Sequence, residues 1–183
     1  MKRAMIILAE GFEEMEAVAP IDVLRRAEVE VTVAGLDRDH VKAARGTVIK
    51  TDKVFDGGEP LPDALVFPGG LPGAENLAGS AMVKDYIRKM DSENRVIAAV
   101  CAAPALVLGP AGVLKGKKAT CYPGLEKNFD ISVKHVKDEV VQDGNIITSR
   151  GPGTALPFAL KIAENLVGKA KAGMLAEQML YRS

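Results

Sequence analysis

The sequence predicts an α/β protein with a mainly parallel central sheet that helices cover on both faces. Short apolar, β-branched segments alternate with longer segments of helical periodicity along the chain, which is the pattern of βαβ units. Residues 96–100 (VIAAV) form an unbroken apolar segment, as expected of a strand buried on both faces. Asp143-Gly144-Asn145 separates two further apolar segments and predicts one late antiparallel hairpin.

The remaining elements follow from the same periodicities. Helices are expected at residues 14–27, 80–93, from about 103, 154–167 and 170–181, and strands at 4–8, 29–36, 48–51, 64–67, 96–100, 118–120, 139–142 and 146–149. Pro20 predicts a kink or a later start in the first helix, whereas Ser80 and Thr154 are expected N-caps. Because no linker or repeat divides the chain, residues 1–183 are expected to form a single domain.

Composition and charge argue against several classes of function. The chain has 24 Lys and Arg residues and 24 Asp and Glu residues, so its formal net charge is zero. It is therefore not expected to bind a membrane surface, or nucleic acid other than as a glycated substrate. The apolar segment at residues 4–9 is too short for a signal peptide, and no segment has the roughly 18 apolar residues of a membrane span. We therefore expect a cytoplasmic protein.

Cysteine and histidine are scarce. Cys101 and Cys121 are the two cysteines, in no CxxC arrangement, and His40 and His135 lie far apart in the sequence. In a cytoplasmic chain this pattern indicates free thiols rather than a disulfide. It also matches no metal-ligand spacing, so the sequence predicts no metal site. Cys121 follows a weak strand, and we interpret it as a structural residue.

Cys101 is the candidate nucleophile, because it lies between a buried strand and a helix start. It directly follows residues 96–100, and Pro104 three positions later is typical of a first helical turn. The free N–H groups of a helix start favour a thiolate and can hold an oxyanion. The small neighbours Ala99 and Ala103 permit the sharp turn of a nucleophile elbow. The alternative is that Cys101 is a small buried hydrophobic residue.

Glu16 is the candidate acid and base. On a helical period it shares an apolar face with Pro20, Val23 and Ala27. A carboxyl in apolar surroundings has a raised pKa, which suits general acid–base catalysis beside a thiol. Loops at the carboxyl ends of parallel strands form one crevice. We therefore expect Glu16 and Cys101 to converge there.

Two further segments supply candidate binding groups. Gly69 and Gly70 follow residues 64–67, and their amides are a candidate oxyanion cradle, with a tight turn as the alternative. Arg45 is a candidate anion-binding residue, with a surface salt bridge as the alternative. The chain lacks GxGxxG and GxxxxGK[ST] motifs, so these glycines do not form a nucleotide site. No cofactor is expected.

Several segments, taken in order, resemble the DJ-1 branch of the DJ-1/ThiJ/PfpI superfamily. They include ILAEGFEEMEAV with Glu16, the arginine of AARG, FPGG, AAVCAAP around Cys101, and ITSRGPGT. The resemblance covers nearly the whole chain. It implies a flavodoxin-like three-layer sandwich, a homodimer, and Cys101 as an oxidation-sensitive nucleophile hydrogen-bonded to Glu16. It further implies that amides of Gly70 and Ala102 line the pocket.

The resemblance also implies a function. It implies cofactor-independent glyoxalase activity on methylglyoxal or deglycase activity on early glycation adducts, linked to oxidative-stress protection. The alternative is a redox-responsive chaperone or sensor that uses oxidation of Cys101. A peptidase is less expected, because Ala102 stands where the protease-like branch has a histidine. Tyr122 stands where the best-known animal member has a histidine, and its hydroxyl can hydrogen-bond a substrate. A Cys–His hydrolase using His135 is a third hypothesis, although residues 131–136 alternate like a strand.

Overall fold

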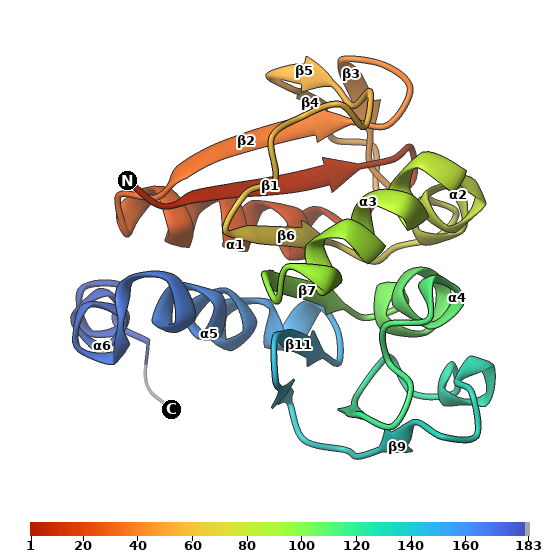
Figure 1. Ribbon diagram of the computed structural model, residues 1–183. Coiled ribbons are helices and arrows are strands. Elements are labelled where there is room, and N and C mark those ends of the chain that lie inside the picture. Colours follow the sequence, from red (N-terminus) through yellow and green to blue (C-terminus); the bar gives the residue numbers. More distant parts are fainter. Residues whose placement is uncertain (182–183) are drawn as a thin grey trace.

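A seven-stranded sheet forms the centre of the computed structural model, which describes residues 1–181 (Figure 1). Its strand order is β10-β11-β7-β6-β1-β2-β5. All neighbouring strands are parallel except β10 and β11, which form the predicted hairpin. The strands are β1 (Arg3–Leu8), β2 (Glu30–Gly35), β5 (Lys53–Val54), β6 (Ala64–Phe67), β7 (Val96–Val100), β10 (Val140–Asp143) and β11 (Ile146–Ser149). The predicted α/β class is therefore confirmed.

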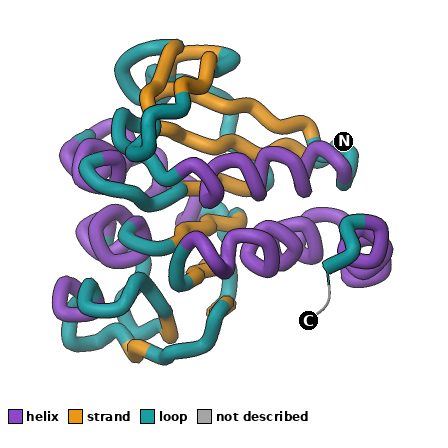
Figure 2. The backbone as a smooth tube through the Cα atoms, turned by 180° about the vertical axis from the view of Figure 1, so that it is seen from behind, coloured by secondary structure: helices purple, strands orange, loops and turns teal. Residues whose placement is uncertain are grey.

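Helices cover both faces of this sheet and complete the three-layer sandwich. On one face α1 (Glu14–Arg26) and α5 (Ala155–Val167) lie side by side (Figure 2). The other face carries α2, α3 and α4 (Figure 1). Their bounds are α2 (Gly73–Gly79), α3 (Ala81–Ser92) and α4 (Gly109–Ala111), and α6 (Lys169–Gln178) packs against α5.

Short elements lie outside the main sheet. Two pairs of strands form small separate sheets, the antiparallel pair β3 and β4 and the parallel pair β8 and β9. The four strands are β3 (His40–Lys42), β4 (Val48–Lys50), β8 (Lys118–Ala119) and β9 (Lys134–His135). Three short helical turns are the π-helix η1 (Pro104–Leu108) and the 3₁₀-helices η2 (Glu126–Asn128) and η3 (Pro152–Thr154).

Some elements differ from expectation. The strand expected at residues 48–51 belongs to the small β3–β4 hairpin, while β3, β5 and α2 were not predicted because each is too short or too rich in glycine to show periodicity. Pro20 lies inside α1, which begins at Glu14, so a later start is wrong. Ser80 caps α3 by accepting the N–H of Val83. Thr154 precedes α5, but its hydroxyl bonds Gly151 rather than the helix.

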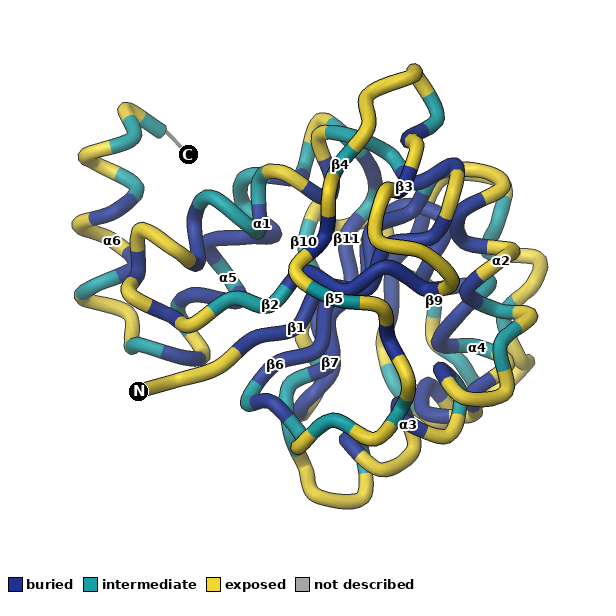
Figure 3. Tube along the Cα trace, turned by 90° about the horizontal axis from the view of Figure 1, so that it is seen from above, coloured by how far each residue is buried: buried dark blue, intermediate teal, exposed yellow. Residues whose placement is uncertain are grey.

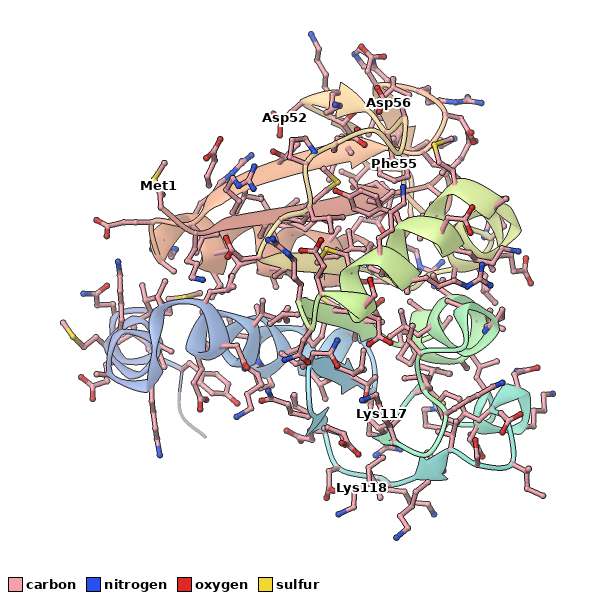
Figure 4. The ribbon with its side chains drawn as sticks, viewed as in Figure 1. Met1, Asp52, Phe55, Asp56, Lys117 and Lys118 are labelled. Atoms are coloured by element: carbon pink, nitrogen blue, oxygen red, sulfur yellow. The ribbon has the colours of Figure 1, made fainter. Side chains whose placement is uncertain are left out.

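The core lies along the central strands. Figure 3 shows these strands buried and the outer turns exposed. At the β5 edge, Phe55 points toward α3 and meets Tyr86 edge-on, with ring centroids 5.2 Å apart (Figure 4). β6 lies between β1 and β7, so the loops that follow these three strands meet at one edge. Within residues 1–181, no helix combines the length and apolar character needed to cross a bilayer.

Candidate active site

Glu16, the Gly69-Gly70 loop and Cys101 come together at the carboxyl ends of β1, β6 and β7. The Gly69 N–H donates to Glu16 Oε2 at 2.8 Å, and the Gly69 carbonyl accepts the N–H of Glu13 at 3.0 Å. A Cβ added to Gly69 would lie 2.7 Å from Cys101 Cβ. The predicted convergence follows from the strand order, because β6 holds the glycine loop between the other two.

Cys101 occupies a sharp turn between β7 and η1. Its φ of 63° lies in the left-handed region, which costs a residue other than glycine about 1–3 kcal/mol. Hydrogen bonds hold the turn on both sides: the Cys101 N–H donates to Ser149 at 3.0 Å, and the Cys101 carbonyl accepts the Tyr122 N–H at 2.8 Å. Strain of this kind is typical of a nucleophile elbow, where the backbone presents one side chain to a pocket.

Glu16 is a fully buried carboxyl on α1. The apolar face that the sequence predicts is present, since Glu16, Pro20 and Val23 are all buried. Burial raises the pKa of Glu16 to about 7, and the hydrogen bonds from Gly69 and Cys101 offset part of this rise. The charge of Glu13 raises the Glu16 pKa further. Near neutral pH the Glu16 carboxyl therefore both releases and accepts a proton readily.

The Cys101 thiol differs from the thiolate that the sequence predicts. Burial and then the neighbouring Glu16 raise the pKa of Cys101 to about 12, although amides of Gly70 and Ala102 lower it as expected. The helix-start amides are outweighed because the residue is only 9% exposed and faces a carboxyl group. Between about pH 7 and about pH 12 the pair therefore holds one proton. Thiol with carboxylate and thiolate with carboxylic acid have the same charge, so Glu16 can activate the sulfur by taking its proton.

A cavity of about 300 Å³ opens at the sulfur. Five predicted residues line it, namely Cys101, Ala102, Gly70, Tyr122 and Arg45. Sequence reasoning missed the other lining residues, which are Glu13, Ala44, Leu71, Leu125 and Pro152. Leu71 and Pro152 directly follow glycines of two recognised turns, which was an available signal. Leu125 carried the same signal, because it directly follows Gly124 in the Pro123-Gly124 turn.

Gly69 has a different role from the predicted oxyanion donor. Its N–H is already bonded to Glu16 Oε2, and Gly69 is not among the residues that line the cavity. A side chain at this position would also lie 2.9 Å from both the Ala102 nitrogen and Glu16 Oε2. Gly69 therefore positions the carboxyl group, and its lack of a side chain lets the three loops approach one another.

Arg45 and Tyr122 form the exposed rim of the cavity. The Arg45 N–H donates to Glu14 Oε1 at 2.8 Å, which anchors the loop. Among residues 1–181 no carboxylate pairs with the Arg45 guanidinium, so the expected alternative of a surface salt bridge is wrong. The Tyr122 side chain packs over Gly151, where a Cβ would lie 3.4 Å from the ring. Both rim side chains can therefore reach a bound ligand.

His135 lies outside this cavity. It belongs to β9, is half-buried as expected, and has Cys121 and Glu126 as neighbours. No histidine lines the Cys101 cavity among the residues described, so the structure gives no support to a Cys–His hydrolase. Both cysteines are free thiols, as the sequence predicts.

Comparison with known proteins fits this geometry. The model of the DJ-1/PfpI family matches residues 2–165. The chain belongs to the DJ-1/PfpI family. It is 46% identical to Protein dj-1beta of Drosophila melanogaster over 182 residues, which cover 98% of this chain and 97% of that protein. The crystal structure of Drosophila melanogaster DJ-1beta superposes with a TM-score of 0.94 at 45% identity, covering 100% of this chain and 99% of the other.

The family also includes a relative named for an activity. The glutathione-independent glyoxalase DJR-1.2 of Caenorhabditis elegans is 35% identical over 181 residues, covering 97% of this chain and 96% of that protein. The chain is thus a full-length match to the DJ-1 branch of the family, as its motifs indicate.

Replacing Gly69 with Ala should disrupt the site selectively. The new methyl group would lie within 2.9 Å of both backbone and Glu16, so Glu16 and Cys101 must move apart. We expect at least a tenfold slower alkylation of Cys101 by iodoacetamide, followed by peptide mass. Gly79→Ala, where a Cβ meets nothing within 4 Å, is the matched control. Equal rates in the wild type and Gly69→Ala would show that Gly69 does not position the pair.

Proposed function

We propose that the protein is a cofactor-independent glyoxalase that converts methylglyoxal to lactate, with Cys101 as nucleophile and Glu16 as acid and base. The observation that carries this proposal is a thiol that lies beside a fully buried carboxyl of pKa about 7, at a cavity of about 300 Å³. Such a cavity suits a small dicarbonyl, and the exposed Arg45 guanidinium on its rim suits its polar oxygens. The relative named as a glutathione-independent glyoxalase supports the same assignment.

The first step forms a carbon–sulfur bond. Glu16 takes the Cys101 proton as the sulfur adds to the aldehyde carbon of methylglyoxal. The amides of Gly70 and Ala102, which lower the pKa of Cys101, are near enough to stabilise the developing oxyanion. Protonation of that oxygen gives a neutral hemithioacetal and returns Glu16 to its carboxylate form.

The next steps move hydrogen between the two carbons. Glu16 removes the proton from the former aldehyde carbon, which gives an enediolate. The hydroxyl proton then moves from the oxygen on that carbon to the oxygen of the former ketone, and Glu16 delivers its proton to the carbon of the former ketone. The product is a lactoyl thioester on Cys101. Water hydrolyses the thioester, releasing lactate and the free thiol, so the net change is addition of one water to methylglyoxal.

Deglycation is a related reaction at the same site. An early adduct of methylglyoxal on an amine or thiol still carries carbon at the aldehyde oxidation level. Transfer of that carbon to Cys101, with release of the amine or thiol, gives the same hemithioacetal. The exposed rim formed by Arg45 and Tyr122 leaves space for the protein or nucleotide that carries the adduct.

Redox sensing is the alternative use of this site. A sulfinate on Cys101 would accept hydrogen bonds from protonated Glu16 and from the Gly70 and Ala102 amides. The change would then alter binding of a client protein rather than turnover. Because the pKa of the thiol is raised, reaction with peroxide, like reaction with a dicarbonyl, depends on Glu16 taking the Cys101 proton. Two free thiols also fit the reducing cytoplasm, where we propose that the protein acts.

We further propose a homodimer that uses a face beside the active site. Met15 and Val18 are exposed apolar residues on α1, at 55% and 48%. Together with Leu156 and Met179 they line an apolar groove between α1 and the C-terminal helices. Pro152 lines both this groove and the Cys101 cavity. A second copy on this face would therefore shield the groove and stabilise the cavity wall.

Lactate formation tests the enzymatic proposal. Lactate should be measured directly with methylglyoxal, because buffer adducts also consume the dicarbonyl. We expect Glu16→Gln to lower kcat by about 10²–10⁴-fold, the usual contribution of a general acid or base, and Cys101→Ser to lower it at least as much. His40→Gln, on an exposed histidine paired with Asp39, is the matched control. Full activity in Cys101→Ser would exclude the mechanism. If neither the wild type nor any variant forms lactate, the result would favour redox sensing.

The oligomeric state tests the dimer. We expect the wild type to elute as a dimer in size-exclusion chromatography with light scattering at micromolar concentration. Val18→Glu should convert it to a monomer, because a charge would be buried in the apolar contact. Val48→Glu, at an exposed valine of the β3–β4 hairpin, should remain dimeric. A monomeric wild type, or a dimeric Val18→Glu variant, would contradict this interface.

A further inference from the structure

A second group of reactive side chains lies outside the Cys101 cavity. Cys121 follows β8, Glu126 begins η2, and His135 ends β9. One thiol, one carboxylate oxygen and one ring nitrogen of these residues all lie within 4.8 Å of one another. They belong to the small lobe at the lower edge of Figure 1, where Figure 4 labels Lys118 on β8.

The backbone of this lobe fixes the three residues relative to one another. β8 and β9 pair in parallel, with Ala119 opposite His135, and the Val136 N–H donates to the Ala119 carbonyl at 3.0 Å. The Gly124 N–H donates to Glu126 Oε2 at 2.6 Å. Contacts of this kind orient the ligands of metal centres. The hydrogen bonds of the lobe therefore hold these three side chains near one another.

The three donors match the coordination chemistry of zinc. Zinc binds cysteine sulfur, histidine nitrogen and carboxylate oxygen in tetrahedral geometry, with bonds of about 2.0–2.3 Å. Tetrahedral bonds of that length place donor atoms roughly 3.3–3.8 Å apart. The three donors would therefore need to approach by about 1 Å. Glu126 and His135 are half-buried rather than enclosed, so rotation of their side chains can provide this movement.

We propose that Cys121, Glu126 and His135 form a three-ligand site for a thiophilic divalent cation of the zinc type. The fourth position is left for water. Binding replaces the thiol proton of Cys121 with the metal and releases that proton to solvent. Cys121 is 1% exposed, whereas Glu126 and His135 are more accessible, so the cation enters from their side.

Nearby cations limit the affinity without preventing binding. Burial makes the Cys121 thiol harder to ionise, and the positive charge of Arg150 offsets part of this effect; the positive charge of Lys137 lies near Glu126. These two positive charges balance the thiolate and carboxylate that a bound metal requires. Binding must therefore come from metal–ligand bonds rather than from net negative charge, which favours a thiophilic cation over Mg²⁺ or Ca²⁺.

A bound cation would stabilise one wall of the active-site cavity. Tyr122 and Leu125 line that cavity, and each is next to a proposed ligand, Cys121 or Glu126. The Tyr122 N–H also bonds the Cys101 carbonyl. A metal that joins Cys121 to Glu126 therefore closes a short loop whose inner residues face the substrate.

Direct metal binding tests the proposal. Co²⁺ is the probe, because a thiolate ligand gives it a charge-transfer band and tetrahedral geometry gives intense visible bands. Titration of the reduced Cys101→Ser protein, which keeps only the Cys121 thiol, should produce both bands with one cation per chain. Zn²⁺ added afterwards should remove them. Cys121→Ser should lack the charge-transfer band.

His135→Gln separates a built site from a single reactive thiol. It should weaken Zn²⁺ binding, measured by calorimetry in the Cys101→Ser background, by at least about tenfold, since even outer contacts of metal ligands contribute that much. His40→Gln should bind Zn²⁺ as the parent does. Circular dichroism of each variant reports folding, so lost binding in a folded protein supports the site. Unchanged binding in His135→Gln, or no Co²⁺ band in the Cys101→Ser protein, would overturn the proposal.

Discussion

The site depends on burial of one carboxyl group, Glu16, against one thiol, Cys101. Glu16 is fully buried, and a rise of its pKa from 4.5 to about 7 on folding destabilises the protein by roughly 3 kcal/mol above pH 7. The sign follows from the raised pKa: the cost is absent below pH 4.5 and complete above pH 7. The strained backbone at Cys101 adds to this cost in the free energy of folding. The buried central strands offset both costs, which is why a reactive pair can persist at the edge of this sheet.

Strand order and a glycine convert this buried pair into a usable site. Because β6 lies between β1 and β7, its loop contacts both the acid and the nucleophile. Gly69 lies at this contact, donating its N–H to Glu16 while a side chain would collide with Cys101. The same arrangement supplies the Gly70 and Ala102 amides near the sulfur. The positions of the acid and the nucleophile, the proton transfer between them and the stabilisation of the oxyanion therefore all depend on the close contact of these three loops.

The sequence predicts the parts of this site that depend on local pattern. Cys101 follows from an apolar strand and a helix start, and Glu16 from the face that it shares with Pro20 and Val23. The protonation of the sulfur was not predictable, because it depends on burial and on the distance to Glu16, which only the tertiary structure sets. The grouping of Cys121 with His135 had no linear signal, because β8 and β9 bring together residues 14 positions apart. Short elements such as β5 and α2 have too few residues to show the periodicity of a strand or a helix.

The pH dependence of Cys101 alkylation tests the shared proton most directly. Iodoacetamide rates should be measured by the mass of the peptide that contains Cys101, in wild type and Glu16→Gln. Because the reactive pair forms when Glu16 loses its proton, the wild-type rate should rise through pH about 7 and then level off. Glu16→Gln should lack this rise and react slowly until well above that pH. The same rise through pH 7 in both proteins would contradict the account.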